Sequence, residues 1–327
     1  MRAVQVNEFG SPDSLIVAEL PDLHPGPGEV VIKVAAAGVN FPDILVVEGT
    51  YQNLPERPFS PGKEAAGTIV AVGEGVQRLA VGQRVLTLVE FGAFTEQLLV
   101  PEDLVVAIPD ELPFEEAAAF GLVYSTAYFG LVRRARLEAG EWALITGAGG
   151  GVGSAGVQLA KALGAKVVAL AHDEQRAELA RTQGADVALV ADVSTLRDDL
   201  LRVTDGHGVD VVLDMVGGDV FSQIVRATAW EGRLVIVGFA SGGQNPIKPG
   251  HLLVKNIAVM GVQSSDYRDR MPELMRSTME EMLQLYVQGK ISVPVDSVFP
   301  LSKAGDALQA IKDGNVRGKI VIAPERS

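Results

Sequence analysis

The sequence predicts an α/β protein that combines an antiparallel, barrel-like β domain with a parallel, doubly wound sheet. The length of 327 residues favours about two domains. The first hundred residues are patterned as short β-strands, whereas strands and helices alternate strictly from Glu141 onward. Because this alternation stops after residue 262, we expect residues 122–262 to be inserted into a first domain made of residues 1–121 and 263–327.

The first domain is predicted to be β-rich because runs of β-branched or alternating residues are separated by Gly and Pro. These runs are Val30–Val34, Thr68–Val72, Arg84–Leu88 and Phe94–Val100. They are not joined by helical stretches, so we expect antiparallel pairing rather than a βαβ repeat. After Pro113, residues 115–132 have the length and the Ala and Leu content of one helix.

The inserted domain is predicted from six short apolar strands, with helical stretches between most of them. The strands are Ala143–Thr146, Lys166–Ala171, Val187–Val190, Val209–Met215, Arg233–Val237 and Ile257–Val262, and the helices are residues 151–164, 174–184, 195–205 and 219–228. Strands joined by helices run parallel, with both faces of the sheet covered. The remaining elements, which we expect to return to the first domain, are helices at 272–288 and 303–312 and strands at 292–299 and 319–323.

Composition excludes several classes of function. Acidic residues outnumber basic ones by 41 to 28, a net charge of −13, which argues against a nucleic-acid or anionic-membrane surface. The chain has no cysteine, which excludes disulfides, thiol nucleophiles and thiolate zinc sites. Its four histidines are not closely spaced, so a His-rich metal site is not expected. No apolar run approaches about 18 residues and the first ten residues lack a signal peptide's apolar core, so we expect a soluble, cytoplasmic protein.

A glycine-rich segment, ALITGAGGGVGSAG at 143–156, follows one strand and opens a helix. In that context the helix N-terminal N–H groups face a dinucleotide pyrophosphate. Two registers fit the G-x-G-x-x-G spacing: Gly151, Gly153 and Gly156, or, with alanine first, Ala148, Gly150 and Gly153. We favour the second because Ala148 lies two residues beyond the strand; the alternative to binding is a glycine-rich turn without a ligand. The candidate cofactor-binding residues here are Ala148, Gly150, Gly151, Val152 and Gly153.

Six ordered motifs carry a resemblance over nearly the whole chain. They are GVNFPDILVVEGTYQ (38–52), PGKEAAGTIVAVGEGV (61–76), GAGGGVGSAGVQLAKALGA (147–165), DMVGGDVF (214–221), GRLVIVGFASG (232–242) and RGKIVIAP (317–324). The chain resembles the medium-chain dehydrogenase/reductase superfamily, in its zinc-independent NADPH:quinone oxidoreductase branch. The resemblance implies a GroES-like β-barrel catalytic domain, an inserted six-stranded Rossmann domain, an active site in the cleft between them, and a homodimer or homotetramer.

The residues aligned with the zinc ligands of relatives are Asn40, Lys63 and Leu122. An amide, an ammonium and an alkyl group do not hold zinc, so the resemblance implies a reductase without metal. Its cofactor would be NADPH, and its substrate a quinone or an α,β-unsaturated carbonyl, which accepts hydride with only a hydrogen bond or a proton to help.

By resemblance, Asn40 and Tyr51 belong to the reacting end of the site. The Asn40 amide would bind the nicotinamide ribose or the acceptor oxygen; alternatively it caps local backbone. Tyr51 stands where related enoyl thioester reductases have a proton donor; alternatively it packs a loop. Thr126 would line the nicotinamide site, or bond to the preceding helical turn. Some relatives have a second aromatic residue six positions before the tyrosine aligned with Tyr51, and that position is Leu45 here.

Further residues carry over from the same motifs. Val216, in the DMVGGDVF motif, would bind the cofactor, and the stretch that would hold the carboxamide is Val237, Gly238 and Phe239. Lys319 would reach the pyrophosphate, or be a solvated strand-end lysine. Residues 262–271 are polar where many relatives are aromatic-rich. Lys63 and Glu64 are expected to pair with each other or with Asp43.

The second strand of the inserted domain predicts NADPH over NADH. It ends in Ala171, where an NAD-dependent domain usually has an acid for the adenosine ribose. Arg176 would pair with a 2′-phosphate and His172 would add a donor. Asp173 opposes this preference, and the alternative for Arg176 is a solvated residue paired with Asp173 or Glu174.

The sequence therefore predicts an NADPH-dependent, zinc-independent reductase of a quinone or another activated conjugated carbonyl. One alternative is an enone, enal or enoyl-thioester double-bond reductase. An alternative of another class is a non-enzymatic NADPH-binding structural or sensing protein, as in superfamily members recruited to such roles.

Overall fold

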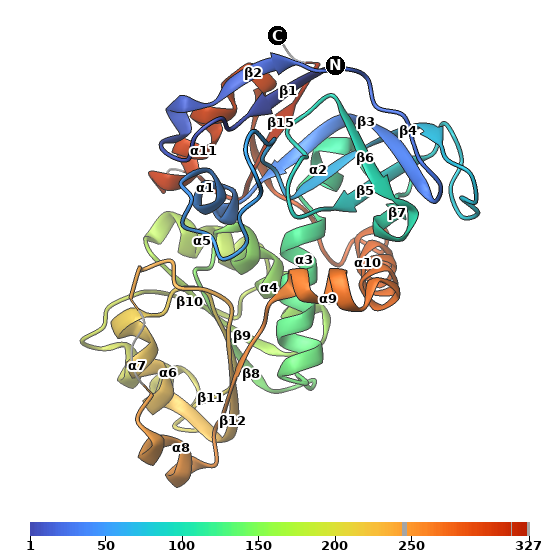
Figure 1. The fold of residues 1–327 in the computed structure, drawn as a ribbon. Coiled ribbons are helices and arrows are strands. Elements are labelled where there is room, and N and C mark those ends of the chain that lie inside the picture. The colour runs from blue at the N-terminus through green and yellow to red at the C-terminus, as the bar shows by residue number, and fades with distance from the viewer. Residues whose placement is uncertain (244–246, 315, 326–327) are drawn as a thin grey trace. The chain divides into compact units, whose positions relative to one another are not determined.

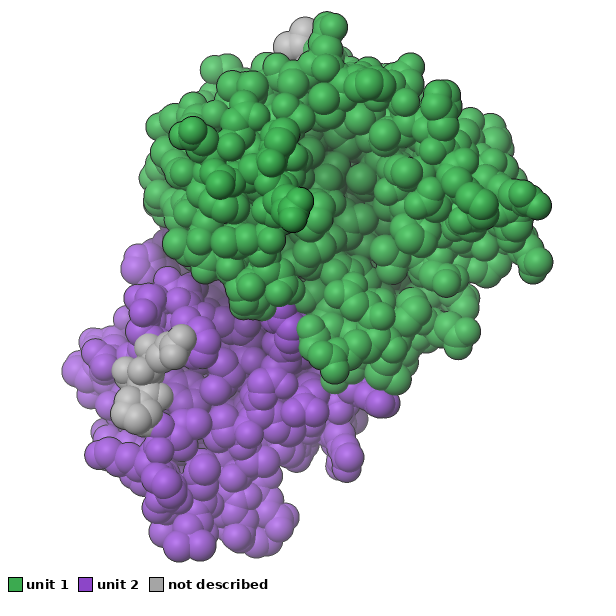
Figure 2. All heavy atoms as spheres, in the orientation of Figure 1, with its two compact units in different colours: residues 1–122, 265–287, 293–327 green, residues 123–264, 288–292 purple. Residues whose placement is uncertain are grey.

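The computed structural model describes residues 1–243, 247–314 and 316–325. It divides into two compact units (Figure 2). Unit 1 comprises Met1–Leu122, Ser265–Val287 and Val293–Ser327, and unit 2 comprises Val123–Ser264 and Gln288–Ser292. The short segment 288–292, which we expected in the first domain, is thus grouped with unit 2.

Unit 2 is built on a six-stranded parallel sheet, as predicted (Figure 1). Its strands are β8 (Trp142–Thr146), β9 (Lys166–Ala171), β10 (Val187–Val190), β11 (Val209–Asp214), β12 (Thr228–Ile236) and β13 (Ala258–Gly261). Their order is β10-β9-β8-β11-β12-β13 and each neighbouring pair is parallel. The strand order therefore reverses between β8 and β11, which is where doubly wound sheets bind ligands.

Helices connect these strands and cover the sheet. They are α3 (Gly121–Tyr128), α4 (Gly151–Ala162), α5 (Glu174–Thr182), α6 (Leu196–Val203), α7 (Gly218–Ala227) and α8 (Pro249–Lys255). α4 packs on β8 and β9, and α5 packs on β9 and β10. Fully buried Leu144, Val168, Val212 and Leu234 place the core on the sheet, where continuous apolar strands are expected to be covered on both faces.

The prediction of a single helix at residues 115–132 is wrong. α2 (Phe114–Ala118) ends before α3 begins, and α3 continues as a π-helical segment, Phe129–Arg134. Phe120, which separates α2 from α3 in the sequence, has a fully buried side chain, and a Cβ atom on Gly121 would lie 2.9 Å from a methyl carbon of Leu88. Close packing at this connection, which residue composition does not reveal, accounts for the break.

Unit 1 contains a seven-stranded sheet whose N-terminal strands pair antiparallel, as predicted. The strands are β3 (Glu29–Val39), β4 (Glu64–Val72), β5 (Arg84–Leu88), β6 (Gln97–Pro101), β7 (Val105–Ala107), β14 (Val295–Pro300) and β15 (Lys319–Ala323). The order is β14-β15-β3-β4-β5-β7, and β6 pairs with β3. β15 is antiparallel to β3 with Ile320 opposite Val39, which brings the neighbouring Lys319 to the end of β3.

The remaining elements of unit 1 are helices, short 3₁₀ turns and one hairpin. The helices are α1 (Phe41–Val47), α2, α9 (Ser264–Arg270), α10 (Pro272–Val287) and α11 (Ala304–Lys312), and the 3₁₀ turns are Pro12–Ser14, Glu102–Leu104 and Leu301–Lys303. The polar stretch 262–271 thus contains a helix, α9, that the sequence did not predict. Within the described residues, no helix combines the length and the apolar composition needed to cross a membrane.

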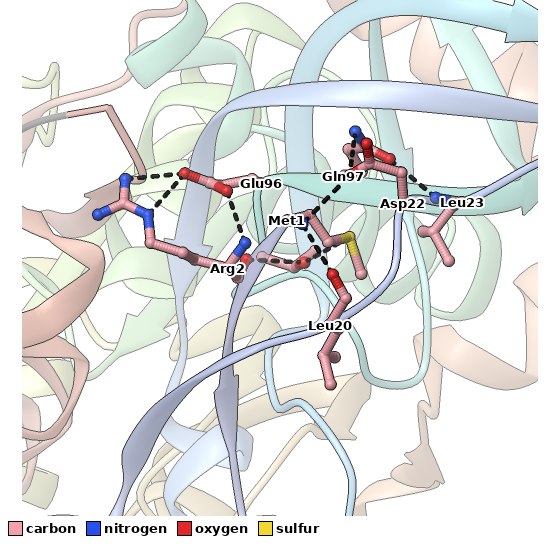
Figure 3. A network of polar contacts seen from close by, with 8 residues as sticks. Met1, Arg2, Leu20, Asp22, Leu23, Glu96 and Gln97 are labelled. Carbon is pink, nitrogen blue, oxygen red and sulfur yellow. Dashed lines mark hydrogen bonds and ion pairs between the residues drawn. The ribbon is translucent and has the colours of Figure 1, made fainter.

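The hairpin, also not predicted, pairs β1 (Arg2–Gln5) with β2 (Ile16–Glu19). Figure 3 shows how polar contacts hold it. The Arg2 Nε atom donates to Glu96 Oε1 at 2.8 Å, and the backbone nitrogen of Met1 contacts Leu20 O at 2.8 Å. The hairpin is therefore fastened to the segment that leads into β6.

Candidate functional site

The glycine-rich turn joins β8 to the N-terminus of α4. Gly147 and Gly149 have φ angles of 61° and 93°, in the left-handed region that favours glycine. A Cβ atom on Gly153 would lie 2.2 Å from the Gly147 carbonyl oxygen, so only glycine lets the helix approach the turn this closely. Gly150 is the N-cap of α4 and has no side chain to cap the first N–H groups, which lack intrahelical acceptors.

These features fit the pyrophosphate of a dinucleotide. Ala148, Gly150, Gly151, Val152 and Gly153, the predicted residues, share one turn and the first turn of α4. The uncapped N–H groups and the helix dipole favour an anion at this position. Sequence spacing missed the two glycines that the turn conformation requires, Gly147 and Gly149, because a positive φ leaves no trace in a spacing pattern.

Asp214, which the sequence did not single out, organises the adjoining strand ends. Its Oδ1 accepts hydrogen bonds from Thr146 Oγ1 at 2.6 Å and from the Val216 N–H at 3.1 Å, and its Oδ2 accepts one from the Gly217 N–H at 3.1 Å. Burial raises the pKa of the Asp214 carboxyl, although these donors favour the ionised form. The carboxyl ends of β8 and β11 are thereby locked together on both sides of the topological switch point, with Val216 beside them.

The stretch after β12 lies at the same edge of the sheet. The Val237 N–H donates to the Asp214 carbonyl oxygen at 2.8 Å, and a Cβ atom on Gly217 would come within 3.1 Å of the Phe239 ring. Val237 and Gly238 are half-buried, whereas Phe239 is exposed. The predicted residues after β8, β11 and β12 therefore gather where parallel sheets bind ligands.

Arg176 and Asp173 form a pair at the start of α5. Asp173 is the N-cap, accepts a hydrogen bond from the Arg176 N–H at 2.8 Å, and forms an ion pair with the Arg176 guanidinium. That backbone hydrogen bond is the main cause of the lowered pKa of Asp173. The Arg176 side chain also lies against the glycine-rich turn, because a Cβ atom on Gly149 would be 2.7 Å from Arg176 Cβ. His172 is exposed next to this pair.

Thr126 is buried on α3. Its Oγ1 lies 3.0 Å from the Oγ of Ser264, the first residue of α9. This hydroxyl pair holds the Thr126 side chain to a residue 138 positions further along the chain.

In unit 1, Lys319 is buried. The prediction that it could be a solvated lysine at a strand end is therefore wrong. Its side chain is 5% exposed, and Nζ donates to Val39 O at 3.1 Å, to Asn40 Oδ1 at 2.5 Å and to Glu64 Oε1 at 2.8 Å. An ammonium has three N–H groups. This arrangement therefore leaves Lys319 no donor for a pyrophosphate oxygen, which corrects the role expected for it.

Asn40 has one fixed amide orientation. Its Nδ2 donates to Glu64 Oε1 at 2.9 Å and to Gly38 O at 3.3 Å, while Oδ1 accepts from the Lys319 ammonium. A carboxylate accepts only and an ammonium donates only, so the amide cannot turn over. Both Nδ2 hydrogens are used, so Asn40 has no further donor and its amide can act towards a ligand only as an acceptor, through Oδ1.

The Asp43 side chain caps the start of α1 as part of a capping box with Asn40. Its Oδ2 accepts from the Asn40 backbone N–H at 2.8 Å. Burial raises the pKa of the Asp43 carboxyl to about 7, and Glu64 adds to the rise. The charges of Lys63 and Lys319 and the Asn40 hydrogen bond oppose it without cancelling the cost of burial.

Tyr51 is half-buried against the unit 1 core, and the ammonium of Lys63 lies 4.5 Å from its ring centroid. Lys63 Nζ also donates to Glu90 O at 3.0 Å and to Glu90 Oε1 at 2.9 Å. The expected pairing of Lys63 with Glu64 is therefore wrong, because Glu64 pairs with Lys319 instead.

The three positions aligned with zinc ligands are thus occupied by other interactions. Asn40 and Lys63 make the contacts given above, and the Leu122 N–H donates to Glu64 Oε2 at 2.8 Å. In the part of the chain that the structure describes, no three His, Cys, Asp or Glu side chains are grouped as metal ligands.

Comparison with known proteins agrees with this architecture. Residues 26–110 match the family described as "Alcohol dehydrogenase GroES-like domain", and residues 151–283 match "Zinc-binding dehydrogenase". A "Quinone oxidoreductase-like protein 2 homolog" of Nematostella vectensis is 37% identical over 98% of this chain and 88% of its own length.

Two solved structures are similar over nearly the whole chain. A mycobacterial protein in complex with NADPH has a TM-score of 0.92 and 31% identity, covering 99% of this chain and 100% of its own. The CurK enoyl reductase has a TM-score of 0.89 and 29% identity, covering 98% of both chains. Together with the quinone oxidoreductase-like relative, they identify the chain as an oxidoreductase of the medium-chain dehydrogenase/reductase family.

Proposed function

We propose that the protein is an NADPH-dependent reductase that transfers hydride to a quinone or another activated conjugated carbonyl, without a metal ion. The observation that carries the proposal is the phosphate-binding geometry of unit 2. There the uncapped N-terminus of α4 approaches the glycine-rich turn so closely that only glycine fits at Gly153, and the Arg176 side chain packs against the same turn. When bound, the reduced nicotinamide supplies the hydride.

Two features of β9 and α5 support NADPH rather than NADH. β9 ends at Ala171, so no carboxylate stands at the position that usually binds the ribose hydroxyls of NAD. Arg176 lies beside the glycine-rich turn, where its guanidinium would pair with the 2′-phosphate if it left Asp173. The similar mycobacterial structure in complex with NADPH supports the same choice.

In unit 1, Asn40 and Tyr51 would take different parts in the reaction. Because Asn40 has only an acceptor left, we propose that Oδ1 binds a hydroxyl of the nicotinamide ribose rather than the acceptor's carbonyl oxygen. Tyr51 has a phenolic hydroxyl that can donate, so it would supply the hydrogen bond or proton that the reduced acceptor needs.

A second candidate is the reduction of an enone, an enal or an enoyl thioester. It is favoured by the similarity to the CurK enoyl reductase. Such a reaction would use the same hydride donor, with the proton delivered to carbon rather than to a quinone oxygen. Tyr51 could serve either reaction, so the choice of acceptor decides between them.

We also propose that the protein forms a homodimer or homotetramer. Three large apolar side chains of unit 2 are strongly exposed: Trp230 (64%), Leu253 (80%) and Val254 (78%). Burial of such residues against a second copy would stabilise an assembly. Sedimentation equilibrium should give at least twice the mass of 34.5 kDa, and a monomer at micromolar concentration would contradict the proposal.

The function is tested by the loss of absorbance at 340 nm when NADPH meets quinones, enals and crotonyl thioester. We expect turnover with at least one class and tight NADPH binding in a separate fluorescence titration. Tyr51→Phe should lower kcat with the KM for NADPH little changed, because only the hydroxyl is lost. Tight NADPH binding without oxidation by any acceptor would contradict the proposed reaction.

A further inference from the structure

A buried chain of charges leads away from Tyr51 within unit 1. Lys63 has a side chain that is 5% exposed and holds Glu90 by two hydrogen bonds. The other carboxylate oxygen of Glu90 accepts from Arg268 Nη2 at 2.9 Å. Arg268 is 6% exposed and also pairs with Asp269. The chain therefore runs from Tyr51 through Lys63 and Glu90 to α9, and every cation in it is buried.

The geometry at Lys63 explains why its charge acts on Tyr51. Two of its three N–H groups are directed to the Glu90 carbonyl and carboxylate oxygens. The ammonium also lies 4.5 Å from the centroid of the Tyr51 ring, within the range of a cation–π interaction. Such contacts contribute most when the cation is desolvated, as it is here.

We propose that Lys63 is a positioning residue for Tyr51, with Glu90 and Arg268 holding the ammonium in place. This inference rests on the proposed function, in which Tyr51 assists the reduced acceptor. The ammonium over its face fixes the plane of the Tyr51 ring and holds a positive charge close to the ring that carries the donating hydroxyl. Lys63 thus acts through Tyr51 and not on the cofactor.

The same chain accounts for two of the charged residues in the polar stretch 262–271, Arg268 and Asp269. Arg268 is the residue of α9 that is buried, and its partner Glu90 follows β5. Removing one partner of a buried ion pair leaves an uncompensated charge. An aromatic residue at position 268 would remove one of the two cations that bind Glu90. The Glu90 side chain would then be less well placed to hydrogen-bond the Lys63 ammonium.

The test compares Lys63→Met, Lys63→Arg, Tyr51→Phe and the double variant Tyr51→Phe/Lys63→Met in the full chain. Lys63→Met should lower kcat about tenfold or more, with the KM for NADPH changed less than about twofold. Lys63→Arg keeps a cation that can stack on the ring and should retain most of the rate. In the Tyr51→Phe background, Lys63→Met should lower kcat by less than about a further twofold, because Lys63 acts through the hydroxyl that Tyr51→Phe removes.

Two controls separate a positioning role from a structural one. Lys303→Met removes an exposed lysine that pairs with Asp306 at 3.0 Å, and should leave kcat unchanged. Glu90→Gln keeps an acceptor for Lys63 and removes the charge, so it should lower kcat less than Lys63→Met does. If Lys63→Met does not fold, a fall in kcat for Glu90→Gln at unchanged KM supports the inference, and a normal kcat overturns it.

A spectroscopic measurement is independent of turnover. In protein labelled with 3-fluorotyrosine, the ¹⁹F resonance that Tyr51→Phe removes should shift in Lys63→Met but not in Lys303→Met. The inference is overturned if the resonance does not shift in Lys63→Met or if this variant keeps the full kcat. It is also overturned if the losses of kcat in the two single variants multiply in the double variant. If instead the parent protein reduces no acceptor, the proposed function fails, and the ¹⁹F spectrum alone decides on Lys63.

Discussion

The Lys319 ammonium lies 2.8 Å from Glu64 Oε1, with side chains only 5% and 2% exposed. The two residues are 255 positions apart, on β15 and β4, so the pair joins the last segment of unit 1 to the first. Glu64 uses its second oxygen to accept the Leu122 N–H at the start of α3. One carboxylate thus ties together two strands and the connection that leaves unit 1, and it orients Asn40.

Breaking this pair should destabilise the protein. Lys319→Met leaves the Glu64 carboxylate buried without its cation, which we expect to lower the free energy of unfolding by about 3–5 kcal/mol. Equilibrium urea unfolding measures it, with Lys303→Met as the surface control. The double variant Glu64→Gln/Lys319→Met removes both charges and should recover part of the loss. A change below about 1 kcal/mol in Lys319→Met, as for an exposed pair, would contradict the buried arrangement.

The raised pKa of Asp43 predicts how stability depends on pH. Asp43 has an ordinary value of 3.8, and its pKa in the folded chain is about 7. Between these values the folded state binds more protons than the unfolded state, so this group's contribution to stability is present below pH 4 and is lost as pH rises to 7. Asp43→Asn keeps an oxygen that can cap α1 and cannot ionise, so it should remove that loss.

The measurement is urea unfolding of both proteins at several pH values from 4 to 8. Relative to the parent, Asp43→Asn should gain stability as pH rises, with most of the gain between pH 4 and 7. Asp306→Asn, at an exposed carboxyl, is the control. A constant difference between Asp43→Asn and the parent over this range would show that Asp43 is already ionised at low pH.

Local patterns were sufficient to predict the doubly wound sheet and its glycine-rich turn. A strand followed at once by glycines and a helix is a contiguous feature, and the structure has it at β8, Gly150 and α4. The N-terminal strands were likewise predicted from runs of β-branched residues. The break between α2 and α3 was not, because it depends on how Phe120 packs.

The charged residues of unit 1 could not be paired from the sequence. Lys63 and Glu64 are neighbours, yet each finds its partner far along the chain, at Glu90 and at Lys319. Lys63 lies just before β4 and Glu64 is the first residue of this strand, so their neighbourhood in sequence does not by itself bring the two side chains together. The same long-range pairing placed Lys319 in a buried network instead of at a phosphate. Asp214 was missed because a buried carboxylate that binds backbone N–H groups has no spacing pattern.

Metal removal should leave the protein unchanged. Asn40, Lys63 and Leu122 stand at the aligned ligand positions, and none of these side chains binds zinc. After dialysis against a strong chelator, NADPH oxidation and the melting temperature should equal those of the untreated protein. Elemental analysis is the direct check, and one zinc ion per chain in active protein would contradict this prediction.

Arg176 should determine the preference for NADPH. Its side chain packs against the glycine-rich turn through Cβ and Cγ, and we expect its guanidinium to bind the 2′-phosphate, so its loss removes a charged contact. Arg176→Ala should raise the KM for NADPH about tenfold or more and leave the KM for NADH nearly unchanged. Arg181→Ala, on the same helix but paired with Glu174 and Glu178, is the matched control.

Asp173 makes this prediction sharper, because its carboxylate competes with the phosphate for the Arg176 guanidinium. Asp173→Ser keeps a side chain that can cap α5 and removes the competing charge. It should therefore lower the KM for NADPH, and the combination with Arg176→Ala should abolish that gain because no guanidinium remains to be released. Steady-state kinetics of the four proteins with both cofactors measures this. Equal use of NADPH and NADH by the parent protein would show that Arg176 stays with Asp173 and does not select the cofactor.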